Sequence, residues 1–134
     1  MRYKQKIAGI FLLALLISGC NGSSALKIAD VVFADDNLKQ CVVDTKALFV
    51  DELTSLSCGS RSITSVSGLE ELTALTTLVL YNNQLTAVDL TQNTELTQLQ
   101  LANNQLTAID VTQNTKLTQL QLDNDVVCTG DVCP

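Results

Sequence analysis

The C-terminal half of the chain repeats itself with a period of 21 residues. Residues 75–95 read LTTLVLYNNQLTAVDLTQNTE and residues 96–116 read LTQLQLANNQLTAIDVTQNTK, identical at 15 of 21 positions, and residues 117–127 begin a third copy, LTQLQLDNDVV. A unit this short cannot bury its own apolar side chains and gains a core only by stacking on its neighbours. The period therefore predicts a solenoid, and the 134-residue length supports one small domain.

Within each copy, the apolar residues follow the spacing of the leucine-rich repeat, L-x-x-L-x-L-x-x-N-x-L. The first full copy matches this pattern with Leu75, Leu78, Leu80, Asn83 and Leu85. A looser copy runs from Leu53 to Leu72, so residues 53–127 hold about four units. The 21-residue form with LTxxDxTxN resembles the repeats of bacterial internalin-J-like surface proteins. The resemblance implies a narrow right-handed α/β solenoid, mostly β, with extended structure on both sides.

Each L-x-L segment predicts a short strand whose leucines point inward while the alternate residues point outward. Asn83 and Asn104 fall where the chain leaves the strand, and an amide there can satisfy backbone groups that have lost their ladder partners. Asp125 replaces this amide in the last unit. The second half of each repeat is β-branched and too short for a stable helix, so we expect extended structure there.

The outward residues beside the strand leucines form the candidate ligand-binding surface. In leucine-rich repeats this concave sheet face is the usual ligand surface, and amides with one aromatic ring can hydrogen-bond a peptide or a sugar. The alternative is that these side chains are only soluble filler from repeat duplication. The candidate residues are Thr77, Val79, Tyr81, Gln98, Gln100, Gln119, Gln121 and Asp123.

Both ends of a solenoid need protection, because an open end exposes apolar side chains and unpaired strand groups. Residues 33–52 predict an N-terminal cap, with Asp35 or Asp36 capping a helix that presents one apolar face. The segment also resembles the capping region before leucine-rich repeats in secreted bacterial proteins. Residues 128–134 are expected to close the other end.

The chain has five cysteines, and the four that follow Cys20 are an even number, which suggests two disulfides if the chain is exported. A four-thiolate zinc site is the alternative, but the spacings lack paired C-x2-C knuckles. Cys41 falls on the apolar face of the predicted helix and could reach Cys58, which replaces a strand leucine in the first unit. Cys128 and Cys133 would close a small ring over the last unit, with Gly130 supplying the turn.

Residues 1–19 have the layout of a secretory signal, with three basic residues, an apolar run and then small residues. The alternative is an anchor helix, although the run is too short to span a bilayer. The segment Leu16-Ile17-Ser18-Gly19-Cys20 resembles the lipobox of bacterial lipoproteins, which implies lipidation of Cys20. Residues 20–32 would then be a tether. The residue after Cys20 is Asn21, whereas inner-membrane retention of Gram-negative lipoproteins is commonly marked by an aspartate at this position. The outer membrane is therefore favoured.

Composition excludes several function classes. Removing residues 1–19 takes three of the eight basic residues and none of the 14 acidic ones, so the mature chain carries 5 − 14 = −9 and is unsuited to nucleic acid. The chain has no histidine, which removes the usual general base and the commonest metal ligand. We therefore expect no enzyme activity, no cofactor and no metal.

Two acidic motifs are compared with calcium sites because carboxylates are the usual calcium ligands. Residues 123–125 begin like a calcium loop but lack its later glycine and glutamate. Asp89 and Asp110 occupy equivalent repeat positions, where each carboxylate either bonds its own turn or shares a cation with the other.

The sequence thus favours a monomeric, lipid-anchored module of the cell envelope that binds a protein partner through its sheet face. Two alternatives stay open. One is a glycan or peptidoglycan binder, and the other is an envelope spacer without a specific ligand.

Overall fold

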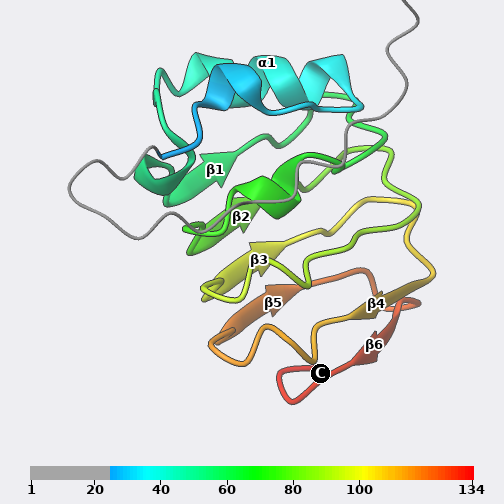
Figure 1. The fold of residues 1–134 in the computed structure, drawn as a ribbon. Coiled ribbons are helices and arrows are strands. Elements are labelled where there is room, and N and C mark those ends of the chain that lie inside the picture. Colours follow the sequence, from blue (N-terminus) through cyan, green and yellow to red (C-terminus); the bar gives the residue numbers. More distant parts are fainter. Residues whose placement is uncertain (1–24) are drawn as a thin grey trace, which may run out of the picture.

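A computed structural model describes residues 25–134; the predicted leader, Cys20 and residues 21–24 of the predicted tether lie outside the described residues. One short strand from each turn of the chain stacks in parallel, in the order β1-β2-β3-β5 (Figure 1). Their bounds are β1 (Ser55–Ser57), β2 (Thr77–Val79), β3 (Gln98–Gln100) and β5 (Gln119–Gln121). The predicted solenoid of parallel strands is confirmed.

The strands pair at equivalent positions of successive repeats. Leu78 lies opposite Leu56 on one side and Leu99 on the other, and Leu99 lies opposite Leu120. The central leucine of β1, β2 and β3 is buried while its two neighbours point outward, which is the alternation the L-x-L pattern predicts. In the last strand Leu120 is only partly buried, because no further unit covers it.

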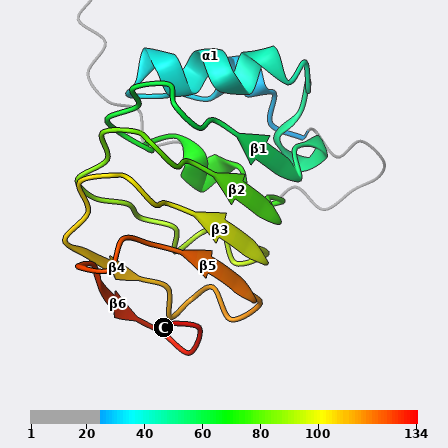
Figure 2. The same ribbon diagram turned by 180° about the vertical axis from the view of Figure 1, so that it is seen from behind.

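The opposite side of the repeats is extended, as predicted. Strand β4 (Ala108–Asp110) pairs in parallel with β6 (Val127–Thr129), and both lie across the core from the larger sheet (Figure 2). The first unit has a single 3₁₀ turn here, η3 (Leu69–Glu71). Within residues 25–134 the cap holds the only α-helix, and no helix there is both long and apolar enough to cross a membrane.

Asn83 joins two units at the turn after the strand, as predicted. Its Oδ1 accepts hydrogen bonds from the backbone N–H groups of Arg61 and Ile63, each at 3.0 Å. Its Nδ2 donates to the carbonyl of Cys58 in the preceding unit at 2.9 Å. Asn104 also bridges two units. Each amide therefore replaces ladder bonds that the backbone loses where it turns out of the sheet.

A second ladder of asparagines, which the sequence analysis missed, lies on the other side of the core. Asn93 is fully buried, and its Nδ2 donates to the carbonyls of Leu69 and Leu72 at 2.8 and 3.0 Å. Asn114 donates in turn to the carbonyls of Leu90 and Asn93. The sequence does contain a sign of this ladder, because the same asparagine occurs in both copies of TQNT. An asparagine at such a position is typical of an ordinary turn, so it does not by itself predict burial.

We expect Asn93→Ala to lower the free energy of unfolding by about 1–3 kcal/mol, because two buried hydrogen bonds from the side chain to backbone carbonyls are lost. Gln92→Ala, at the exposed neighbouring position, is the control and is expected to change it by about 0.5 kcal/mol or less. Urea denaturation of both variants gives the comparison. Equal losses would contradict a bridging role for Asn93.

The N-terminal cap contains α1 (Asp36–Asp44), which lies across one end of the stack (Figure 1). Its buried residues are Leu38, Cys41 and Val42, the predicted face. Cys41 is bonded to Cys58 with Cα atoms 5.9 Å apart, so a disulfide joins the cap to the first repeat.

The cap begins upstream of the predicted boundary at residue 33. Ile28 and Val31 are buried, and the short 3₁₀ helix η1 (Ile28–Asp30) lies in this stretch. The N–H of Ile28 donates to the carbonyl of Leu48, and the N–H of Val50 donates to the carbonyl of Leu26, both at 3.0 Å. Residues 26–31 are therefore part of the cap rather than tether, because this antiparallel pairing and the burial of two apolar side chains hold them in place.

Asp35 is the N-cap residue of α1 and also bonds the first repeat. Its Oδ1 accepts from the N–H of Leu38 at 3.0 Å, and its Oδ2 accepts from the N–H and hydroxyl of Thr64, each at 2.8 Å. Burial raises the pKa of Asp35, but the hydrogen bonds from Thr64 and Leu38 outweigh it and leave the pKa below its ordinary value of 3.8. The charged carboxylate thus stabilises the folded state.

Asp35→Ala should cost about 1–2 kcal/mol of unfolding free energy near neutral pH, the usual loss of an N-cap. Because the pKa of Asp35 is lowered by folding, this contribution is present above the ordinary value of 3.8 and is lost as the pH falls through the lowered pKa. The difference from wild type should therefore shrink at about pH 2. Denaturant titrations at both pH values measure it, with Asp36→Ala, an exposed first-turn acid, as control. A difference independent of pH would refute this role of the charge.

At the other end, Cys128 and Cys133 form the predicted ring, with Cα atoms 5.6 Å apart. Gly130 has φ 140°, a conformation that suits glycine, and a Cβ there would lie 2.7 Å from Cγ2 of Val111. The ring therefore packs closely against the preceding unit and covers part of its core.

Candidate ligand-binding face

The larger sheet brings the predicted surface residues into two aligned columns. Thr77, Gln98 and Gln119 occupy paired positions of β2, β3 and β5, and Val79, Gln100 and Gln121 occupy the next outward positions. All six are at least partly exposed. Neighbouring residues in a column are about 4.8 Å apart, the spacing of strands in a sheet. These six residues and Tyr81 are called the sheet face below.

Tyr81 lies just after β2 and is the one aromatic side chain of the sheet face. It is 43% exposed. A Cβ added to Gly59, in the neighbouring unit, would lie 2.6 Å from Cζ of the Tyr81 ring. The ring therefore rests directly on the backbone of Gly59, and the missing side chain there lets it lie close to the sheet.

We expect Gly59→Ala to displace the Tyr81 ring while leaving the free energy of unfolding within about 1 kcal/mol, because the ring is the movable end of a side chain. Near-UV circular dichroism of the mature chain should change, since Tyr81 is its only tyrosine. Ala102→Gly, at the corresponding position two units on, is the control and should leave the signal unchanged. An unaltered spectrum for Gly59→Ala would contradict this packing.

Asp123 differs from the other predicted surface residues because its carboxylate is bound to backbone. Its oxygens accept from the N–H groups of Asn103 and Asn104 at 2.8 and 3.2 Å. Asp123 thus closes the last turn, and Asp125, predicted for that role, is exposed instead. Asp123 is therefore a turn residue, and the sheet face carries no charge.

The glutamine columns border a hollow of about 400 Å³ at the C-terminal end of the sheet face. Val132, from the disulfide ring, forms part of its wall. Val132 was not among the predicted surface residues, because it lies outside the repeat and no periodic signal in the sequence places it beside the glutamines. The hollow offers amide donors and acceptors with one apolar edge, a combination suited to an extended polar ligand.

The acidic motifs on the opposite side bond to their own turns. Asp89 accepts from the N–H of Thr91 at 3.0 Å, and Asp110 accepts from the N–H of Thr112 at 2.9 Å. These backbone bonds, followed by bonds from the threonine hydroxyls, lower the pKa of each carboxyl. Across residues 25–134 there is no group of three or more acidic or cysteine side chains placed to hold a metal ion.

Comparison with known proteins agrees with this geometry. The family described as leucine rich repeats (2 copies) matches residues 51–92. Internalin J of Listeria monocytogenes serotype 4b (strain F2365) is 49% identical over 41 residues, which are 31% of this chain and 4% of that protein.

Solved structures give a longer match. The functional domain of InlJ from Listeria monocytogenes is 38% identical, with a TM-score of 0.64 over 72% of this chain and 24% of that chain. An internalin (inlF) from strain 4b F2365 is 25% identical, with a TM-score of 0.68 over 78% of this chain and 34% of that chain. This chain thus spans between 4% and 34% of the lengths of these relatives.

Residues 51–92 thus match the leucine-rich-repeat family, and the stacked parallel strands have the leucine-rich-repeat fold. The 21-residue units are similar to those of internalin J, which agrees with the resemblance drawn from the sequence pattern.

Proposed function

We propose that this chain is a non-enzymatic, monomeric protein of the cell envelope that is anchored by lipid at Cys20 and binds a protein partner through the sheet face. The observation that carries the binding proposal is the pair of uncharged, at least partly exposed columns that hold four glutamines beside Tyr81, on a molecule that is otherwise strongly acidic. Polar amides held in register by a parallel sheet can pair with the backbone of an extended partner.

The anchor proposal is supported by the lipobox-like segment before Cys20 and by the disulfides. Disulfides persist in oxidising compartments outside the cytoplasm, and the described residues contain two of them. Asn21 favours the outer membrane of a Gram-negative cell. The sheet face has few units, so we expect it to bury less than the roughly 800 Å² per partner of a standard interface and to bind weakly, with a gain from many anchored copies.

The test is chemical cross-linking of the lipidated chain on bacterial membranes, followed by mass spectrometry. Tyr81→Ala/Gln100→Ala should lower partner recovery by at least about tenfold, because a loss of about 1.4 kcal/mol of contact energy is already a tenfold change in affinity. Gln92→Ala/Gln113→Ala, on the opposite side of the solenoid, is the matched control and should leave recovery unchanged.

The same mass spectra also identify the N-terminal peptide of the mature chain. The expected peptide begins at an acylated Cys20, and an unmodified peptide that begins upstream would refute the anchor. Equal partner sets for the two double variants would refute the sheet face as the binding site and favour a spacer.

A glycan ligand is the second candidate function. The flat exposed face of Tyr81 beside glutamine amides is the observation that favours it, because sugars stack on aromatic rings and hydrogen-bond to amides. Retention on peptidoglycan or a glycan array that is lost in Tyr81→Ala, without a cross-linked protein, would favour this function over a protein partner.

A further inference from the structure

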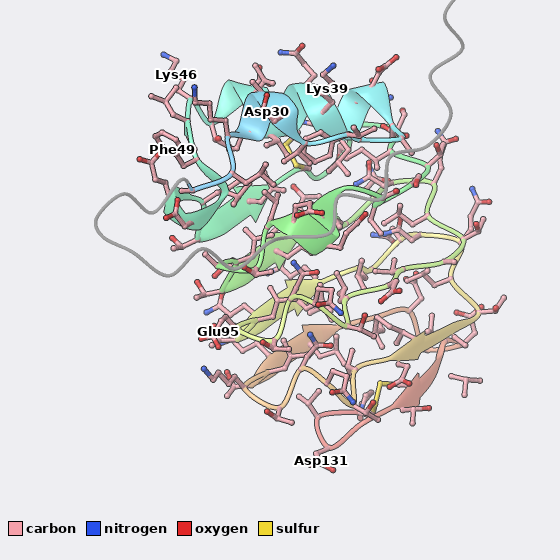
Figure 3. All side chains as sticks on the ribbon, in the orientation of Figure 1. Asp30, Lys39, Lys46, Phe49, Glu95 and Asp131 are labelled. Carbon is pink, nitrogen blue, oxygen red and sulfur yellow. A yellow bond between two sulfur atoms is a disulfide. The ribbon has the colours of Figure 1, made fainter. Side chains whose placement is uncertain are left out.

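The N-terminal cap carries an apolar hollow at the end of the molecule farthest from the C-terminal ring. It is an open hollow of about 570 Å³, and its lining includes the apolar side chains of Ile28, Val43, Leu48 and Phe49 together with Lys27 and Lys46. Figure 3 shows Lys46 and Phe49 at this end and Asp131 at the opposite one. These six residues are called the cap hollow below.

Exposed apolar side chains are concentrated in the cap. Six large hydrophobic side chains are exposed within the part of the chain that the structure describes, and four of them belong to residues 26–48. Val43 and Leu48 line the cap hollow, Leu26 adjoins it in sequence, and Leu48 is 68% exposed. The repeats expose only Tyr81 before the final strand.

The loop that presents Leu48 is held by hydrogen bonds. The carboxylate of Glu52 accepts from the N–H groups of Leu48 and Phe49 at 3.1 and 3.2 Å. The carbonyl of Leu48 accepts from the N–H of Ile28. The exposure of Leu48 is therefore fixed by the fold, and an exposed apolar group held in this way indicates a contact surface.

The chain enters the folded domain beside the cap hollow. Leu26 is paired to Val50 through a backbone hydrogen bond of 3.0 Å, so the position of the first cap residues is set next to the hollow. Cys20 precedes Leu26 by six residues, and six extended residues span at most about 21 Å. A lipid on Cys20 therefore keeps this end of the solenoid within about 20 Å of the membrane.

We propose that the cap hollow docks on the phospholipid surface, with Leu48 and Val43 inserted among the upper acyl chains and Lys27 and Lys46 on headgroup phosphates. The inference rests on the lipid anchor proposed above. Short apolar side chains flanked by lysines are the chemistry of interfacial membrane contacts. The docked solenoid would point away from the membrane, and the sheet face along its side would stay free for a partner.

The test uses single tryptophans, because the chain has none of its own. Leu48→Trp and Val127→Trp are matched probes, since the two positions are 68% and 67% exposed and lie at opposite ends. The lipidated mature chain is placed in vesicles of phosphatidylethanolamine and phosphatidylglycerol containing brominated lipid. Quenching should be about threefold stronger at Leu48→Trp, as expected for a group buried in the headgroup–acyl boundary.

Charge is tested in the same vesicles. Lys27→Glu/Lys46→Glu should reduce the quenching of Leu48→Trp by at least about half, because each lysine near an anionic surface contributes to binding. Lys39→Glu/Lys116→Glu changes the net charge equally without touching the cap hollow and is the control. Equal effects of the two pairs would refute the contact of Lys27 and Lys46 with phosphate.

The outcomes separate the two proposals. A chain that floats with vesicles but shows equal quenching at both probes, or none, refutes docking and leaves the anchor intact. A chain that does not float refutes both. The emission of Leu48→Trp could instead shift as the number of protein molecules per vesicle is raised, without any effect of brominated lipid. That result would show a second copy in the hollow and would also overturn membrane docking.

Discussion

Each turn of this protein depends on the turn before it. A 21-residue unit contributes one three-residue strand and a few leucines, which is too little to form a core alone. Parallel pairing at equivalent repeat positions places Leu56, Leu78 and Leu99 in one continuous buried row. The rest of the structure, including both ends and the sheet face, depends on this stacking.

Stacking also buries backbone hydrogen-bonding groups at the turns. The chain leaves each strand after three residues, and the N–H and carbonyl groups beyond the strand have no ladder partner. Asn83 and Asn93 bond to such groups on the two sides of the core, since each side-chain amide reaches the backbone of the preceding unit. Such bonds connect residues about 20 positions apart, so they hold the units in register as well as satisfying polar groups.

The two ends are closed by different means and are suited to different roles. The N-terminal end has a helix, a disulfide to the first repeat and an apolar hollow edged by lysines. The C-terminal end has only a six-residue disulfide ring, and Leu120 beneath it remains partly exposed. The sheet face lies along the side between them. Partner binding and membrane contact, as proposed, therefore use separate surfaces of one small domain.

The sequence alone determined the period, the strands, the inward leucines, the α1 face and both cysteine pairs, because each depends on residue spacing along one unit or on one helix. The tertiary structure alone decided how units meet. It showed that Asp123 rather than Asp125 closes the last turn, that Asn93 is buried, and that the Tyr81 ring rests on Gly59. It also placed residues 26–31 in the cap. These features depend on contacts between segments far apart in the chain, for which a pattern read along one repeat carries no distance information.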